Sequence, residues 1–232
     1  MGRRFRVSSN PGKTLLWLWI KRDLSAMKGE LGVDLAGGSM LNRRFFRTEK
    51  YISVDINQVK LNEGLQKHPD AEAVNSSIMD YLDNLKDEKP DVLVCVQTMG
   101  TNQFFDHDET YLTVEKMHEV LRSGGGMIFN VGSVGVDLND IERRLNNLLK
   151  GKFKSVKSSF YGAFHSGGGQ PRWDIENDGI VRRSNDTERP KSSRLRAMIS
   201  LSVAYLMYML PPLRTGFGLK KRKLYFCCKG KL

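Results

Sequence analysis

Short runs of apolar residues alternate along the chain with longer stretches in which apolar residues recur every three or four positions. The clearest run, residues 92–96, is apolar throughout, as expected of a strand buried on both faces of a sheet. The longer stretches have the spacing of amphipathic helices. This alternation predicts an α/β fold with a mostly parallel sheet and helices on both of its faces.

The pattern also sets approximate element boundaries. We expect strands over 31–35, 51–54, 71–75, 91–97, 127–131, 153–161 and 223–228. We expect helices over 14–28, 40–47, 57–67, 80–87, 111–122, 138–149 and 194–210. Glycine and proline support these boundaries, since Pro90 precedes one predicted strand and Gly124 follows one predicted helix.

A long segment rich in Gly, Ser and Arg separates the last two predicted strands, and it is too long for an ordinary loop. We interpret it as an insertion between strands six and seven. A single domain over 1–232 is expected. Its parts are a basic N-terminal helix region (1–28), a core (29–161), a basic insertion with an apolar helix (162–221) and a last strand (222–232).

The net charge of +11 is concentrated at the two ends of the chain. Residues 1–28 carry +6, residues 29–149 carry −8 and residues 150–232 carry +13. A mildly acidic core with basic flanks suggests an enzyme held against an anionic surface or substrate rather than a uniformly basic nucleic-acid binder. The alternative is a set of solvated lysines that only aid solubility.

Cysteine usage and the N-terminus indicate a cytoplasmic protein. Cys95, Cys227 and Cys228 lie in apolar runs, so we expect buried thiols in a reducing compartment and no metal site. The apolar run at 15–20 is short and lacks a cleavage site, which disfavours a signal peptide. The uncharged run 197–213 suits an interfacial helix at the inner face of the membrane, or else a helix packed on the domain or at a dimer contact.

One segment has the pattern of a nucleotide-type cofactor site. Asp34 is followed by a turn containing Gly37 and Gly38, and the next predicted strand ends at Asp55, 21 residues after Asp34. Glycines let backbone N–H groups approach a ligand closely, and an acid at the end of the second strand can accept both hydrogens of a ribose diol. The alternative is a tight turn without a ligand.

These residues resemble the class I S-adenosylmethionine-dependent methyltransferases, especially the type 11 kind, over roughly the first 135 residues. Residues 34–40 stand where that family has an acid and a G-x-G-x-G loop, although Ala36 and Met40 replace the first and third glycines. Residues 117–126 are similar to the family stretch R-V-L-K-P-G-G before the fifth strand.

The resemblance implies a Rossmann-like sheet of seven strands with the last strand antiparallel, and S-adenosyl-L-methionine as the cofactor. It also implies a set of cofactor-binding residues, namely Asp34, Ala36, Gly37, Gly38, Asp55, Ile56, Ser77, Ile78 and Gln97. Ser77 stands where many members have an aspartate, and Ile78 beside it is the expected adenine contact. A nicotinamide enzyme is less favoured, because no full G-x-G-x-x-G follows the first strand.

Methyl transfer to a hydroxyl gains from a positioned base. His107, in the acidic segment after the fourth predicted core strand, is the first candidate for this base, and His165 is the second. Both could instead be surface histidines. His68 and His118 fall on predicted helices and are expected to be surface or structural residues.

The substrate is inferred from what the sequence lacks and from its insertion. The N-P-P-Y signature of base-amine methylation is missing, which disfavours nucleic-acid bases. An insertion with an apolar helix and a Pro-Pro end resembles bacterial enzymes that act on cell-surface glycans and lipid-linked oligosaccharides. We therefore expect O-methylation of a sugar hydroxyl at the membrane surface. The alternatives are an RNA methyltransferase and a non-catalytic, membrane-associated protein that keeps the fold.

Overall fold

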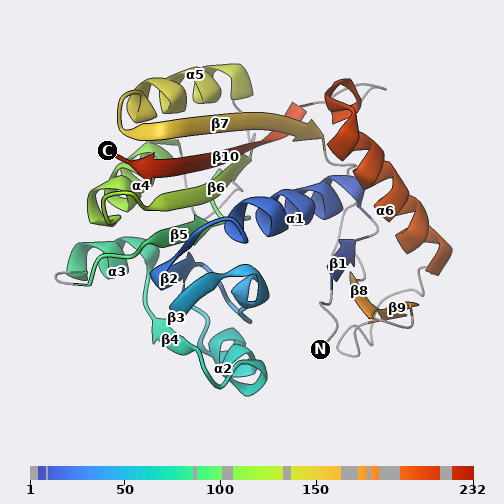
Figure 1. The fold of residues 1–232 in the computed structure, drawn as a ribbon, viewed down its shortest axis with the longest axis horizontal. Helices are drawn as coiled ribbons and strands as arrows, with labels where there is room; N and C mark the ends of the chain where they lie inside the picture. Colours follow the sequence, from blue (N-terminus) through green and yellow to red (C-terminus); the bar gives the residue numbers. More distant parts are fainter. Residues whose placement is uncertain are drawn as a thin grey trace. The chain divides into compact units, whose positions relative to one another are not determined.

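Seven strands form one mixed sheet in the computed structural model, which describes residues 5–8, 10–85, 88–100, 107–132, 137–162, 172–176, 179–182, 194–214 and 221–232. In spatial order the strands are β4 (Glu72–Asn75), β3 (Arg47–Asp55), β2 (Lys28–Leu35), β5 (Val92–Cys95), β6 (Gly126–Gly132), β10 (Lys221–Lys231) and β7 (Phe153–Gly162). The first five of these pair in parallel, whereas β10 runs antiparallel to β6. The predicted sheet with its antiparallel last strand is confirmed (Figure 1).

The chain divides into two compact units. The larger unit holds residues 20–159 and 223–232, and therefore most of the sheet. The smaller unit holds residues 1–19 and 160–222, which include the segment predicted as an insertion.

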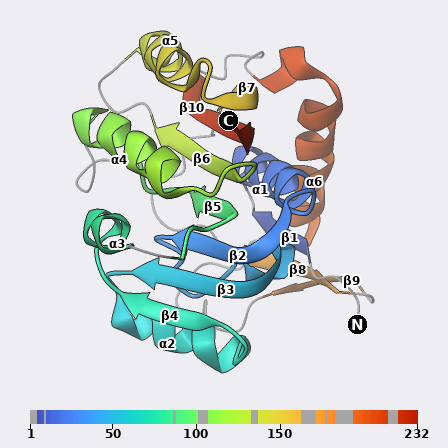
Figure 2. The same ribbon diagram turned by 60° about the vertical axis from the view of Figure 1, so that its left-hand side comes forward.

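Helices cover both faces of the sheet, as predicted. They are α1 (Pro11–Leu24), α2 (Gln58–Lys67), α3 (Ile78–Asn84), α4 (His107–Val120) and α5 (Leu138–Leu149). Figure 2 shows α3, α4 and α5 on one side of the sheet and the end of α1, residues 20–24, on the other. The Asp137 side chain caps α5 by accepting a hydrogen bond from the Asn139 backbone N–H (3.0 Å).

The helix predicted over 40–47 is wrong. Only one 3₁₀ turn, Arg43–Phe45, lies between β2 and β3. Met40 has a left-handed backbone (φ 57°), which an L-residue cannot continue into a right-handed helix. Its side chain is fully buried against Gly64 of α2, where a Cβ would come within 2.6 Å of Met40 Cγ. Core packing by Met40 therefore holds this segment as a compact turn.

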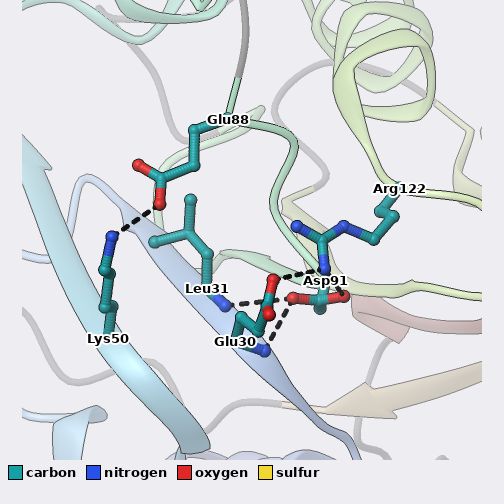
Figure 3. Close-up of polar contacts among 6 residues, drawn as sticks. All are labelled: Glu30, Leu31, Lys50, Glu88, Asp91 and Arg122. Carbon is teal, nitrogen blue, oxygen red and sulfur yellow. Dashed lines mark hydrogen bonds and ion pairs between the residues drawn. The ribbon is translucent and has the colours of Figure 1, made fainter.

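The amino ends of β2 and β5 are joined by a polar cluster (Figure 3). Asp91 Oδ2 accepts hydrogen bonds from the backbone N–H groups of Glu30 (2.8 Å) and Leu31 (3.0 Å). Arg122 pairs with the carboxylates of Glu30 (2.7 Å) and Asp91 (3.3 Å). A Cβ on Gly29 would lie 2.3 Å from Asp91 Cβ, so only glycine fits there. Structural contacts thus occupy this end of the two central strands.

Lys231, near the end of β10, binds the C-terminus of α4. Lys231 Nζ donates to three backbone carbonyls, those of His118 (2.6 Å), Glu119 (3.1 Å) and Leu121 (2.7 Å). These carbonyls belong to the last turn of α4 and the residue that follows it, where a helix leaves acceptors without intrahelical partners and carries partial negative charge. Burial, followed by the charge of Lys89, lowers the pKa of Lys231.

Cys95, Cys227 and Cys228 are buried free thiols, as predicted. Each lies in a strand of the large sheet, Cys95 in β5 and the adjacent pair in β10. Burial raises the pKa of Cys227 to about 12, so this thiol stays protonated at neutral pH.

In the smaller unit, three short antiparallel strands accompany one helix. The strands are β1 (Phe5–Ser8), β8 (Arg172–Glu176) and β9 (Gly179–Arg182), in the order β1-β8-β9. The sequence pattern had indicated none of them. The apolar helix predicted over 194–210 is confirmed as α6 (Arg194–Met209), which packs against β1 and is followed by a 3₁₀ turn, Pro211–Arg214. Within the described residues, the helices are too short or too polar to cross a bilayer.

Candidate functional site

The candidate site lies at the carboxyl ends of β2, β3 and β5. The strands that follow β2 in sequence, β3 and β4, lie on one side of it in the sheet. From β5 onward the strands lie on the other side of β2. The strand order therefore reverses between β2 and β5, where Leu35 lies opposite Cys95. In open α/β sheets, ligands bind outside the carboxyl ends of the strands at such a switch point.

A tight turn, residues 36–38, leaves β2 and folds against the end of β3. The Gly37 backbone N–H donates to the carbonyl of Val54 (3.1 Å). A Cβ on Gly37 would lie 2.4 Å from Ser53 Oγ, so this position must be glycine. Gly38 has φ +50°, and Ala36 before it has φ 54°, a conformation that costs a non-glycine residue free energy. The turn is thus built by close approach of the backbone to β3.

Asp55 ends β3 and faces this turn, as the spacing predicted. Its Oδ1 accepts a hydrogen bond from the Asn57 backbone N–H (2.8 Å), which fixes the carboxylate. A Cβ on Gly38 would lie 3.3 Å from Asp55 Oδ2. Among the described residues, no hydrogen-bond donor binds Oδ2. This oxygen is therefore available to the hydroxyls of a ligand that lies over Gly38.

Lys60 also lies beside Gly38, and the sequence pattern had not indicated it. Its Cδ would be 3.4 Å from a Cβ on Gly38, so its stem lies beside the glycine turn. The Asn57 side chain caps α2 by accepting from the Lys60 backbone N–H (3.1 Å), which places this lysine in the first turn of α2. The sequence offered one clue, an Asn cap directly after the strand that ends at Asp55.

Asp34 lies beneath the turn and is almost fully buried (1% exposed). Its carboxylate accepts hydrogen bonds from Asn42 Nδ2 (3.2 and 3.3 Å) and from the Tyr51 hydroxyl (3.0 Å). Burial raises the pKa of Asp34 to about 7, although both of these hydrogen bonds lower it. In this arrangement the carboxylate ties the segment after the glycine turn to β3.

The loop after β5 is held by β6 and contains a strained residue. Gln97 is exposed and has a left-handed backbone (φ 66°). The buried side chain of Asn130 accepts a hydrogen bond from the Gln97 backbone N–H (2.7 Å), and the Gly132 N–H donates to the Met99 carbonyl (3.0 Å). Strain of this kind collects where a structure holds groups for a ligand. Asn130 is thus a second residue that the sequence analysis missed.

Among the described residues, three non-glycine residues have a left-handed backbone, and two of them, Ala36 and Gln97, follow adjacent strands. They stand at the ends of β2 and β5, directly at the switch point. The site therefore has two backbone segments in unusual conformations, each fixed by a contact to the next strand outward.

Residues 56, 77 and 78 were predicted to bind the cofactor, the last two near its adenine ring. Ile56 is 67% exposed, so its side chain is free to pack on a flat ligand. Ser77 caps α3: its Oγ accepts from the Asp80 backbone N–H (3.1 Å) and donates to the Asp80 carboxylate (2.6 Å). Ile78 is buried. Roles for these three residues in cofactor binding stay predictions.

The structure does not describe the side chain of either candidate base. His107 is the first residue of α4, and its side chain is outside the described part of the structure. His165 lies outside the described residues. His118 packs edge-on against the Phe153 ring (5.4 Å between centroids), and burial lowers its pKa and that of His68. The described side chains at the strand ends supply a carboxylate, amides and a lysine, which are groups that can form hydrogen bonds to a ligand.

The large sheet identifies the fold. A seven-stranded sheet in this order, with its last strand antiparallel, is the fold of the class I S-adenosylmethionine-dependent methyltransferases. No protein-family model and no curated protein sequence matches the chain.

Solved structures share this fold at low sequence identity. A SAM-dependent methyltransferase from Agrobacterium tumefaciens aligns with a TM-score of 0.54 and 11% identity over 95% of this chain and 63% of that chain. The N-methyltransferase NodS from Bradyrhizobium japonicum aligns at 0.51 and 10%, over 95% and 94%. The plantazolicin methyltransferase BamL, determined with SAH, aligns at 0.52 and 10%, over 95% and 85%.

Proposed function

We propose that this protein is a methyltransferase that uses S-adenosyl-L-methionine. The observation that carries the proposal is Asp55 Oδ2, which faces Gly38 at the switch point with no donor bound to it among the described residues. A Cβ on Gly38 would come within 3.3 Å of this oxygen, so the absence of a side chain at Gly38 leaves the carboxylate accessible to the ribose hydroxyls of a bound cofactor. One of the solved structures that share the fold, that of the methyltransferase BamL, contains SAH, which agrees with this choice of cofactor.

Each residue of the site has a distinct part in this proposal. Asp55 accepts hydrogen bonds from the ribose hydroxyls, Gly37 and Gly38 let the backbone approach, and Ile56 packs on the adenine. S-adenosylmethionine supplies an activated methyl group on a sulfonium. The protein aligns the acceptor with that methyl group, and alignment of this kind is worth roughly 7–11 kcal/mol. Gln97, at the end of β5, is placed to contact the cofactor or the acceptor.

The acceptor that we propose is a sugar hydroxyl of a glycan, lipo-oligosaccharide or lipid-linked saccharide. The support is electrostatic: the smaller unit carries fifteen Lys and Arg against five Asp and Glu, a net charge of +10 out of +11. Phosphates of a lipid-linked or nucleotide-linked sugar are attracted to such a surface. We propose His107, and second His165, as the base that accepts the hydroxyl proton.

Titration calorimetry with S-adenosylmethionine and S-adenosylhomocysteine tests the cofactor. Asp55→Ala removes the ribose acceptor and should weaken the affinity roughly a hundredfold, since hydrogen bonds to a charged group are strong. Glu72→Ala is the matched control, because Glu72 is an exposed acid at the opposite end of the neighbouring strand β4. Equal affinity of the Asp55 and Glu72 variants would place the ligand elsewhere.

An RNA acceptor is the main alternative, and the +10 unit is the observation in its favour. RNA binding would weaken steeply with salt, because phosphate contacts release counterions. A non-catalytic protein is the second alternative, since Ala36 and Met40 replace two glycines of the motif. Calorimetry separates a non-catalytic protein from an enzyme, because a protein that has lost the site binds neither S-adenosylmethionine nor S-adenosylhomocysteine.

A further inference from the structure

One face of α6 is an uncovered apolar stripe. Its large side chains are between 49% and 70% exposed, and they are Met198, Ile199, Tyr205, Leu206, Met209 and Leu210. Their spacing of three or four residues places them on one side of the helix. We call these six residues the α6 stripe.

The opposite face of α6 is already packed. Ser200, Ala204 and Met207 are at most 2% exposed, and α6 contacts β1 of the same unit. A helix that is apolar on all sides is normally buried on all sides. Contiguous exposed apolar side chains mark an interaction site rather than an ordinary surface. The α6 stripe is therefore expected to have a partner.

Charge selects the kind of partner. The unit that contains the α6 stripe has a net charge of +10, and Arg194 and Arg196 precede the stripe while Arg214 follows it. A second copy of this chain would bring +10 against +10, which opposes association. An anionic bilayer offers both hydrocarbon for the stripe and negative charge for its surroundings.

We propose that the α6 stripe docks this protein on the surface of anionic membranes. Sixteen residues of α6 give a helix about 24 Å long, shorter than the roughly 30 Å hydrocarbon core, so α6 lies in the plane of the interface. The apolar side chains enter the headgroup boundary, and the tyrosine suits that boundary because its ring is apolar and its hydroxyl is polar. This docking does not depend on methyl transfer.

Co-sedimentation of the full-length protein with vesicles tests the proposal. The probe is vesicles of equal parts phosphatidylglycerol and phosphatidylcholine, compared with phosphatidylcholine alone. Leu206→Ser with Met209→Ser should reduce binding to the anionic vesicles at least about tenfold, because each change removes apolar area from the interface. Binding should also fall as salt rises from about 0.1 M to about 1 M, where the Debye length shortens to about 3 Å.

Val59→Ser with Leu112→Ser is the matched control, because both side chains are exposed aliphatics outside α6. This double variant should bind vesicles like the wild type. Three outcomes overturn the proposal: no binding of the wild type to anionic vesicles, equal loss in both double variants, or binding to RNA without binding to vesicles. A dimer that only the α6 variant dissociates, seen by sedimentation velocity, would show instead that a second copy covers the stripe.

Discussion

Backbone strain at the residue scale is concentrated at the switch point. Gln97 follows β5 in a left-handed conformation and is held there by Asn130, although glycine would adopt the same conformation without strain. Residues in strained backbone conformations cluster at active sites and ligand-binding segments, so we expect the Gln97 side chain to contact a ligand. The amide of Gln97 both donates and accepts hydrogen bonds, which suits a ligand contact.

Two substitutions separate the strain from the function. Gln97→Gly and Gln97→Ala both remove the amide, but only glycine tolerates the left-handed backbone. We expect Gln97→Gly to be more stable than Gln97→Ala by about 1 kcal/mol in urea unfolding. Both variants should bind S-adenosylhomocysteine more weakly, by about tenfold for one lost hydrogen bond. Equal stability of the two variants would show that the backbone at this position is not strained.

Asp34 predicts a specific dependence of stability on pH. Burial raises its pKa from 3.8 to about 7 in the folded protein. Below pH 3.8 the carboxyl is protonated in both states. As the pH rises toward 7, the unfolded state loses this proton first and is favoured.

Asp34→Asn mimics the protonated carboxyl and removes this pH dependence. The free energy of unfolding of the variant should therefore rise relative to the wild type between pH 4 and pH 7, by on the order of 4 kcal/mol, and then stay level. Urea unfolding at several pH values measures this difference. A pH-independent difference would mean that Asp34 is ionised in the folded protein.

At the element scale, the apolar runs were sufficient to predict the large sheet. Four of the five parallel strands and the antiparallel β10 contain a buried apolar run, whereas β4 is exposed at its two ends and only half-buried between them. The short strands β1, β8 and β9 were missed because their sequences are rich in charge and contain no such run. The helix expected over 40–47 failed for a local reason, the left-handed backbone at Met40.

Prediction of the site was limited in the same way. Asp55 could be placed opposite the glycine turn because sequence spacing fixes which strand ends lie together. Lys60 and Asn130 could not, because their contacts depend on how the turn and the loop after β5 fold against their neighbours. Spacing therefore indicates which strand ends meet, whereas side-chain contacts across them require the structure.

The contact of Lys231 with α4 gives a prediction at this scale. Lys231→Met removes a charged donor from three carbonyls at the end of α4 and should destabilise the protein by about 2 kcal/mol. Lys157→Met, at an exposed position of β7, should change stability by less than about 0.5 kcal/mol. Thermal and urea unfolding of both variants provide the measurement. Equal stability would show that water replaces the ammonium at these carbonyls.

At the scale of the whole molecule, the two units differ in charge. The larger unit is nearly neutral, with 22 Lys and Arg against 21 Asp and Glu, and it holds the glycine turn and Asp55. The smaller unit holds nearly all of the net charge and the α6 stripe. The proposed cofactor site and the proposed membrane-docking stripe thus belong to different units, and we expect them to be occupied independently.

Hydrogen exchange followed by mass spectrometry tests this separation of tasks. S-adenosylhomocysteine should slow exchange in residues 34–38, 55–60 and 95–100, because ordering by a ligand suppresses local opening of the backbone it contacts. Anionic vesicles should slow exchange in residues 198–210 and leave those three segments unchanged. Asp55→Ala should abolish only the first effect, and Leu206→Ser with Met209→Ser only the second. Protection of both regions by either probe would contradict independent sites and would indicate coupling between cofactor and membrane binding.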